Sequence, residues 1–198
     1  VKLSKILFMF VALLGVSANS FAVDVTMRIS IQLPMKSHLG QNLLLFKNDV
    51  EKKSNGEIEV QIYDSAQLYK DKEVPAAVGS GSIEAGVASL TRYVGDIPAV
   101  DLFYQPLLLN SDEKVRKAVA KGSSIRGPID KAIEGTGSTV LWWQAYGSAI
   151  MLSKGKPIKN PSDMKGKKVR VFGKTLGAFV KASGGAPTLI SGSEQYLA

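Results

Sequence analysis

The residue that points most clearly to a chemistry is Arg170, in the short stretch 167–172. The alternation of side chains along this stretch predicts a β-strand in which Val169 and Val171 share one face and Arg170 lies on the other. Arginine is permanently charged, and its planar guanidinium can hold a carboxylate through two parallel hydrogen bonds. A cation placed between apolar neighbours in this way favours recognition of a small acid over catalysis.

The residues that common catalytic mechanisms require are scarce. The chain has no cysteine and a single histidine, His38, which excludes thiol catalysis and zinc sites built from Cys and His. It also has no Gly-x-Ser-x-Gly nucleophile elbow. Residues 173–175 read Gly-Lys-Thr, like the end of a phosphate-binding loop. The preceding glycine, Gly166, lies seven positions before Gly173, however, which is too far for that loop. We therefore expect no cofactor.

A second set of candidate ligand contacts lies near the carboxyl ends of predicted strands: Gln32, Ser89, Arg92 and Trp143. Ligands of open α/β sheets usually bind at that edge. Because Trp142 and Trp143 are neighbours on a predicted strand, one faces the core and the other the layer outside. An indole at a cleft wall can stack on a ligand. Tyr146, on the loop that leaves this strand, completes the aromatic set.

The elements that must position these residues alternate between strand and helix. Strands are predicted over residues 26–33, 57–63, 83–90, 139–144, 150–153, 167–172 and 188–190. Helices are predicted from the Ser37 cap to Asn55-Gly56, over 71–78, from the Ser111 cap over 112–121, over 125–134 and 176–183, and from Ser193 onward. Residues 93–110 match no element. This order predicts the α/β class, with a parallel or mixed sheet covered by helices.

Residues 1–22 have the pattern of a secretory signal peptide. Lys2 and Lys5 precede an apolar run at residues 6–16, and residues 20–22 offer a cleavage site. We expect an exported, soluble mature chain that begins at Val23, with a retained anchor as the alternative. No later stretch approaches the ~20 apolar residues of a membrane helix. The formal charge of +8 comes from scattered lysines, which favours a solvated basic surface and no nucleic-acid partner.

Three blocks of sequence together resemble one known family. The first comprises residues 55–63, Ala66-Gln-Leu68 and residues 77–85; the second joins Leu141-Trp-Trp143 to residues 156–171; the third pairs Gly184-Gly-Ala-Pro187 with residues 193–198. In this combination, and over essentially the whole chain after residue 22, the sequence is similar to the DctP-type extracytoplasmic solute receptors of tripartite ATP-independent periplasmic (TRAP) transporters.

The resemblance implies a periplasmic binding protein with a two-lobe α/β fold and mixed sheets, incomplete at its C-terminus. Residues 23–145 would form the first lobe and residues 146–198 the start of the second. A small carboxylate would bind in the cleft and pass to the transporter's membrane subunits, without catalysis. Arg170 occupies the position at which the family binds the carboxylate. Because members are longer, the last third, with the opposite cleft wall, is expected to be missing.

The resemblance also implies further contact positions and shows departures from the family. Contacts are expected at Gln32, over residues 89–92, and around the Trp143–Tyr146 exit. Many members carry a second arginine shortly after the Trp pair, whereas residues 144–150 contain none. Phe172, next to the expected clamp and itself an expected ligand contact, stands where proline is frequent, and Glu84 where aspartate is usual. The missing second cation predicts a monocarboxylate or a hydroxylated, partly apolar acid as the ligand.

Two other classes of protein remain open at this stage. A binding protein of an ATP-driven transporter has the same two-lobe plan. An exported enzyme with a carboxylate-based site is the second alternative; the chain has 17 acidic residues, but no pair of them has a spacing that identifies a reaction.

Overall fold

The structure is a computed structural model that describes residues 23–190 and residue 192. Its elements are β1 (Val25–Ile31), α2 (His38–Lys53), β2 (Ile58–Tyr63), α3 (Val74–Gly79), β3 (Ala85–Val87), the 3₁₀ helices η1 (Leu90–Tyr93) and η2 (Pro98–Tyr104), α4 (Asp112–Val119), α5 (Arg126–Glu134), the 3₁₀ helix η3 (Pro161–Met164), β4 (Lys168–Val171), α6 (Lys174–Ala182) and β5 (Ala186–Leu189). The expected signal peptide and the helix expected from Ser193 lie outside the described residues.

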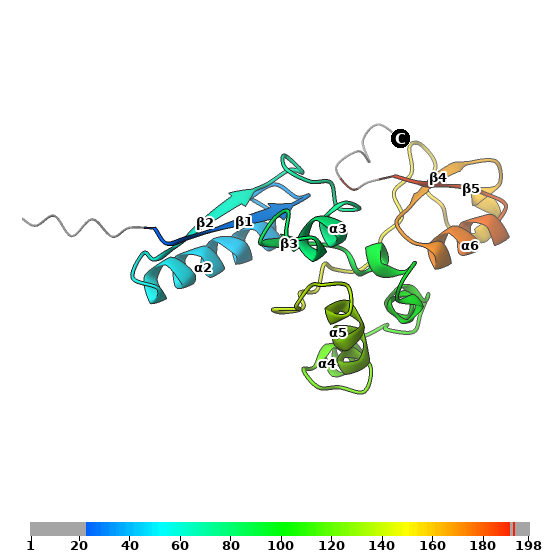
Figure 1. Ribbon diagram of the computed structural model, residues 1–198. Helices are drawn as coiled ribbons and strands as arrows, with labels where there is room; N and C mark the ends of the chain where they lie inside the picture. The colour runs from blue at the N-terminus through cyan, green and yellow to red at the C-terminus, as the bar shows by residue number, and fades with distance from the viewer. Residues whose placement is uncertain (1–22, 191, 193–198) are drawn as a thin grey trace, which may run out of the picture.

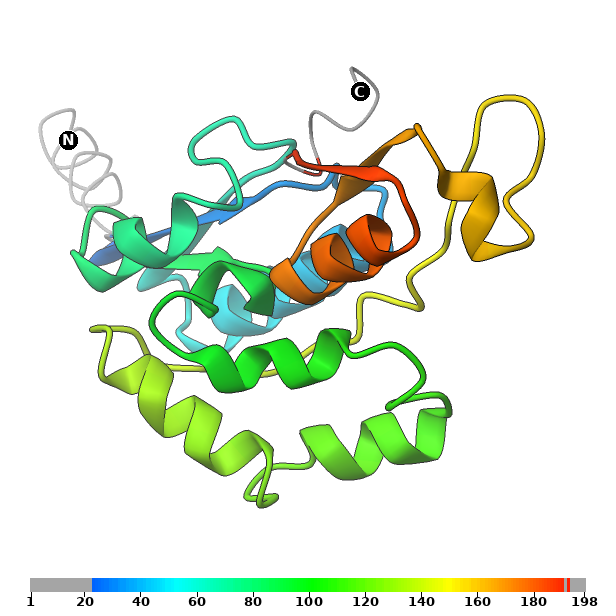
Figure 2. The same ribbon diagram turned by 90° about the vertical axis from the view of Figure 1, so that its right-hand side faces the viewer.

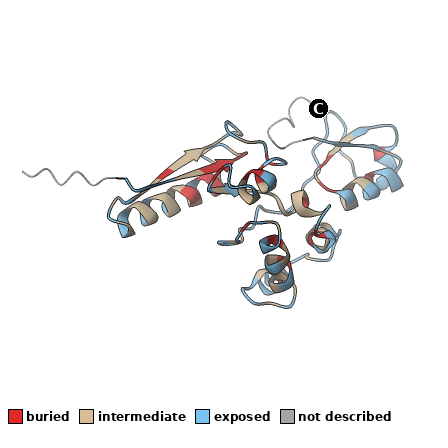
Figure 3. Ribbon diagram, viewed as in Figure 1, coloured by how far each residue is buried: buried red, intermediate tan, exposed pale blue. Residues whose placement is uncertain are grey.

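The first sheet has the strand order β2-β1-β3, and all of its pairings are parallel. Alternation along β1 directs Ile29 and Ile31 into a core that Leu39 and Leu43 of α2 and Val60 of β2 complete. Figure 1 shows α2 along one face of this sheet, and Figure 3 shows buried residues within the sheet and within α2. The predicted strand–helix–strand start of the chain is therefore confirmed.

Local contacts explain where α2 begins. The Oγ atom of Ser37 accepts a hydrogen bond from the backbone N–H of Gly40 at 3.1 Å, so Ser37 is the predicted N-cap. Gly40 is needed for a different reason. A Cβ atom at this position would lie 2.6 Å from the backbone Cα and carbonyl oxygen of Met35, because the chain entering the helix passes directly over the first turn.

The middle of the chain forms a helical cluster around η2 and α5. Its core contains Ile97, Val100, Ile129 and Ile133. Residues 93–110, which match no element by sequence pattern, contain the seven-residue 3₁₀ helix η2. Figure 2 shows α4 and α5 one after the other below the first sheet, on the far side from β5. None of the helices in the part of the chain that the structure describes is long and apolar enough to cross a membrane.

Two predicted strands are wrong. Residues 139–144 and 150–153 form neither strand nor helix. Trp142 and Trp143 do point in opposite directions, but both pack on helices rather than on a sheet. Trp142 packs on Phe46 of α2, with ring centroids 5.0 Å apart, and Trp143 packs into the η2–α5 cluster. A strand also needs a neighbouring strand to satisfy its backbone, and no pairing involves these residues in the described chain.

The second sheet pairs β4 with β5 in parallel, with Arg170 opposite Thr188. Met164, Val171 and Val180 form its core beneath α6. Figure 1 shows this sheet and α6 as a unit at the opposite end of the molecule from α2, with the extended chain after α5 leading to it. The expected lobe boundary at residues 145 and 146 falls within that extended chain.

Candidate ligand-binding site

A buried ion pair lies at the carboxyl ends of the strands of the first sheet. Asp71 is fully buried, and its Oδ2 atom accepts a 2.6 Å hydrogen bond from Nε of Arg92. Its Oδ1 atom accepts from the backbone N–H of Ser89 at 2.9 Å and from the Ser89 hydroxyl at 3.3 Å. A carboxylate is tolerated inside a protein when a cation and further donors satisfy it in this way.

Three loops that follow parallel strands bring these residues together. Gln32 follows β1, Asp71 lies in the loop after β2, and Ser89 follows β3. The Nε2 atom of Gln32 donates to Oγ of Ser89 at 3.4 Å. Ser89 then starts η1, whose first turn, closed by the Arg92 N–H to Ser89 C=O bond at 2.9 Å, directs Arg92 back over Asp71. The predicted clustering of Gln32, Ser89 and Arg92 at one sheet edge is what the structure shows.

Sequence reasoning missed Asp71. The sequence pattern predicts a helix that starts at Asp71, but α3 begins three residues later, at Val74. Its loop is held to β1 by Ser30, whose buried Oγ donates to the carbonyl of Tyr69 at 3.1 Å and accepts from its N–H at 3.2 Å. A serine alternating with isoleucines on a central strand was the one available signal, because a buried hydroxyl must find a partner.

Arg170 lies on β4, and its side chain is only partly exposed. Its Nε atom donates to the carbonyl of Ile190 at 3.1 Å, and its guanidinium lies 5.3 Å from the ring centroid of Phe172. Phe172 in turn contacts Tyr104 of η2 edge-on, with centroids 5.7 Å apart. The terminal nitrogens of Arg170 have no hydrogen-bond partner among the described residues, so they remain free to bind an anion.

The charges around Arg170 show that the two parts of the site are close in space. Burial lowers the pKa of the Arg170 guanidinium below its usual value, and the positive charge of Arg92 lowers it further. Tyr146 and Asp71 act in the opposite direction. Burial, followed by the charge of Asp71, raises the pKa of the Tyr146 phenol. Arg170, Arg92, Asp71 and Tyr146 therefore form one electrostatic group.

The close approach of two glycines after β4 and β5 to side chains of the first unit supports this grouping. A Cβ atom on Gly192, just after β5, would lie 2.6 Å from Oε1 of Gln32, so the chain leaving the second sheet passes against the end of the first. Likewise, a Cβ atom on Gly173, just after β4, would lie 3.1 Å from Cγ2 of Thr91. Oε1 of Gln32 is buried and has no hydrogen-bond partner among the described residues.

Trp143 lies elsewhere. Its indole Nε1 donates to Oδ1 of Asp130 at 2.6 Å, and Phe103 and the Arg126 guanidinium lie 5.2 and 5.4 Å from its ring. These contacts tie residue 143 to α5 and η2. A role for Trp143 as a ligand contact stays a prediction, whereas its contribution to the helical core is visible in the structure.

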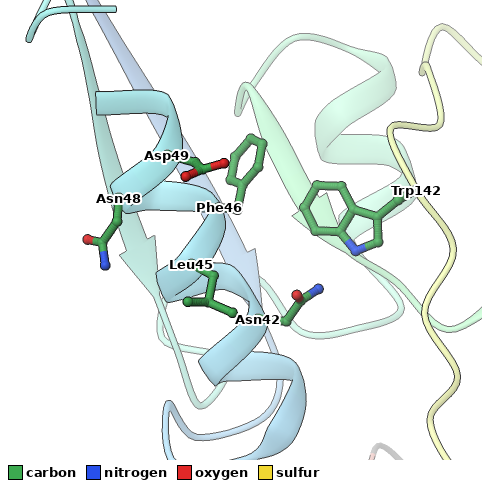
Figure 4. A pocket seen from close by; sticks show the side chains of 6 residues that line it. All are labelled: Asn42, Leu45, Phe46, Asn48, Asp49 and Trp142. Atoms are coloured by element: carbon green, nitrogen blue, oxygen red, sulfur yellow. The ribbon is translucent and has the colours of Figure 1, made fainter. Parts of the chain in front are cut away.

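Trp142 faces the opposite way, toward α2. It lines an open groove of about 420 Å³ together with side chains of that helix: Asn42, Leu45, Phe46, Asn48 and Asp49. Figure 4 shows the Trp142 indole turned toward the ring of Phe46. The groove shares no residue with the group around Arg170. It is therefore separate from the candidate site.

The described residues contain no cluster of three or more His, Cys, Asp or Glu side chains that could hold a metal ion. What the site offers is guanidinium nitrogens, a phenol, an amide and a serine hydroxyl. Two α/β units meet here near the carboxyl ends of their parallel strands, with these groups between them.

Comparison with known proteins identifies the family. Residues 29–198 match the model of the DctP family, described as bacterial extracellular solute-binding protein, family 7. The chain belongs to this family. The chain is 31% identical over 190 residues to the C4-dicarboxylate-binding periplasmic protein DctP of Rhodobacter capsulatus; the match covers 93% of this chain and 55% of that protein. It thus spans about half the length of the relatives that it matches.

Solved structures show the same fold. A TRAP periplasmic solute-binding protein from Polaromonas with bound D-erythronate has a TM-score of 0.80 at 25% identity, and the match covers 87% of this chain and 57% of that one. A second, from Sulfurospirillum deleyianum with bound succinate, has a TM-score of 0.80 at 24% identity, covering 89% and 56%. The resemblance to TRAP receptors and the two-lobe α/β class are thereby confirmed.

Proposed function

We propose that the protein is the solute receptor of a TRAP transporter, which captures a small organic acid and delivers it to the transporter's membrane subunits. The family supports this role, and so do the relatives, which are named as binding proteins for C4-dicarboxylates and for sialic acid. We further propose that residues 1–22 export the chain to the periplasm, where those relatives are found, and that the bound acid is released chemically unchanged.

The bonding of the Arg170 guanidinium is the main support for this proposal. It is partly buried, its Nε is occupied by the carbonyl of Ile190, and its terminal nitrogens are free among the described residues. The hydrogen bond at Nε orients the guanidinium and leaves its two terminal nitrogens available. Two parallel N–H groups can then bind a carboxylate. The guanidinium also rests on Phe172, which limits its motion.

The other contacts surround this clamp. Gln32, Ser89 and Arg92 supply polar groups from the first unit, Tyr146 a phenol from the connecting segment, and Phe172 an apolar surface. We take residues 23–145 as the first lobe and residues 146–198 as the beginning of the second. A ligand that touches both lobes favours their closed arrangement, because it binds that state more tightly. The closed receptor would then dock on the membrane subunits.

The first test is a thermal-shift screen of organic acids on the full-length protein, followed by calorimetry. A ligand at 100 times its dissociation constant stabilises a protein by about 2.7 kcal/mol, which is a readily measured shift. Arg170→Lys keeps the charge but loses the fork, so we expect at least about tenfold weaker binding. Arg116→Lys, on the exposed side of α4, is the matched control. Equal binding by Arg170→Lys would disprove the clamp.

A second measurement separates the receptor from an enzyme. After incubation with stoichiometric protein, mass spectrometry of the recovered acid should show it unchanged. Conversion of the acid to a product would instead favour an exported enzyme with a carboxylate-based site.

A further inference from the structure

The candidate site contains two guanidinium groups but only one uncompensated positive charge. No arginine follows the Trp pair, yet Arg92 supplies a second cation from η1. This cation is already paired: its Nε lies 2.6 Å from Oδ2 of Asp71, and the two side chains are only 10% and 1% exposed. Arg170 makes its described hydrogen bond to a neutral carbonyl instead. The charges of Arg92, Asp71 and Arg170 therefore sum to a single positive charge.

We propose that Asp71 determines the charge of the ligand: by neutralising Arg92 it restricts the site to acids with one carboxylate, and it leaves Arg92 to bind a neutral oxygen of the same ligand. The inference rests on the proposed function, and it adds the class of substrate and a residue that selects it.

The geometry of the ion pair supports both parts of this inference. Asp71 holds Arg92 through Nε alone, and the terminal nitrogens of Arg92 have no hydrogen-bond partner among the described residues. They can donate to a ligand hydroxyl or carbonyl. A second carboxylate placed there would approach a guanidinium whose charge Asp71 already balances. Because both partners are almost fully buried, little water is available to screen the repulsion between that carboxylate and Asp71.

The neighbouring groups also suit a neutral ligand oxygen better than an anion. Oε1 of Gln32 is a buried acceptor without a hydrogen-bond partner among the described residues. The Ser89 hydroxyl, between Gln32 and Asp71, receives a bond from the former and donates one to the latter. A ligand hydroxyl can accept from Arg92 and also donate to a neighbouring acceptor, whereas a carboxylate can only accept. The first unit is thus suited to a hydroxylated end, and Arg170 to the carboxylate end.

The test compares two four-carbon acids of similar size, D-erythronate with one carboxylate and several hydroxyls, and L-malate with two carboxylates. Calorimetry on the full-length wild type should give a dissociation constant at least about tenfold lower for erythronate. Asp71→Asn keeps the shape of the side chain but removes its charge. We expect this variant to bind malate at least about tenfold more tightly than the wild type does, and erythronate no better. Asp49→Asn, an exposed acid on α2, is the matched control.

The double variant Asp71→Asn/Arg92→Gln returns the site to one net positive charge. It should lose the gain in malate affinity, which a purely structural role of Asp71 would not predict. Three outcomes would overturn this inference while leaving the proposed function intact. The wild type could bind malate as tightly as erythronate, or a folded Asp71→Asn variant could have the same ratio of malate to erythronate affinity as the wild type. The double variant could also keep the increased affinity for malate. The wild-type ratio decides the question even if Asp71→Asn does not fold. If no carboxylate binds the wild type at all, the proposed function fails, and this inference with it.

Discussion

The Oγ1 atom of Thr175, in the first turn of α6, donates a hydrogen bond to Oδ2 of Asp101 in η2. The Nε2 atom of Gln105 donates to the same Thr175 oxygen at 3.3 Å. This pair joins the second sheet and its helix to the segment that follows the first sheet. Because the turn between Arg170 and Thr175 also carries Phe172, the join helps to set the position of the candidate carboxylate clamp.

Replacing Thr175 tests this join. Thr175→Val keeps the shape of the side chain but leaves the Asp101 carboxylate, whose Oδ1 is already buried without a partner in the described structure, with no donor at all. An unsatisfied buried acceptor costs about 1–3 kcal/mol, and we expect a loss of stability in that range in urea unfolding. Thr175→Ser retains the hydroxyl and should unfold close to the wild type. A Val variant as stable as the wild type would show that the bond contributes nothing.

Gly40 lies inside a helix, where alanine normally stabilises by about 1 kcal/mol. Here we expect the opposite sign. The new Cβ would lie 2.6 Å from backbone atoms of Met35, and the backbone cannot move aside easily. Overpacking of this kind costs about 1–3 kcal/mol, so Gly40→Ala should lower the midpoint of thermal unfolding. Gly127→Ala in α5, where no atom beyond the chain neighbours and the nearby helix backbone lies within 4 Å of the new Cβ, should be neutral or stabilising.

The N-cap of α2 can be tested in the same assay. Ser37→Ala removes the oxygen that accepts from the Gly40 N–H, and such losses cost about 1 kcal/mol. Ser37→Asn retains a capping oxygen and should recover most of the stability. Ser124→Ala, at an exposed position between α4 and α5, serves as the control. A Ser37→Ala variant that unfolds like this control would contradict the cap.

The ion pair between Arg28 on β1 and Glu84 before β3 predicts part of the pH dependence of stability. Hydrogen bonds from the Arg28 side chain lower the pKa of the Glu84 carboxyl from 4.5 to about 2. A carboxyl with a lowered pKa stabilises the fold above its unfolded value, and the effect is lost as the pH falls from about 4.5 toward 2. The side chains are 39% and 34% exposed, so solvent screening keeps the effect small.

Glu84→Gln should therefore lower the free energy of unfolding at neutral pH and flatten its decline over that acid range. Glu113→Gln, in an exposed helical pair with Lys117, should leave the curve unchanged. If the free energy of unfolding of Glu84→Gln and of the wild type fell in parallel with pH, the ion pair would not contribute to the pH dependence of stability.

Much of the fold could be predicted because it depends on near neighbours. The alternation in β1, β2 and β4 and the serine caps at Ser37 and Ser111 were predicted and are found. The strand predicted over residues 83–90 is shorter, because Asp71 takes the N–H of Ser89 and the chain turns into η1. The tryptophan alternation was recognised, but its partners, α2 and α5, could not be inferred from residues 139–144 alone.

The sequence by itself determined that Arg170 stands between apolar neighbours on a strand. It also placed Gln32, Ser89 and Arg92 near the carboxyl ends of strands, and it showed that the chain is similar to TRAP receptors. Only the tertiary structure decided that Arg92 is paired with a buried Asp71, 21 residues away, while the fork of Arg170 stays free among the described residues. The reason is physical. Strand periodicity and helix caps act over a few residues, whereas the pairing of two charges depends on which loops packing brings together and on how little water remains between them.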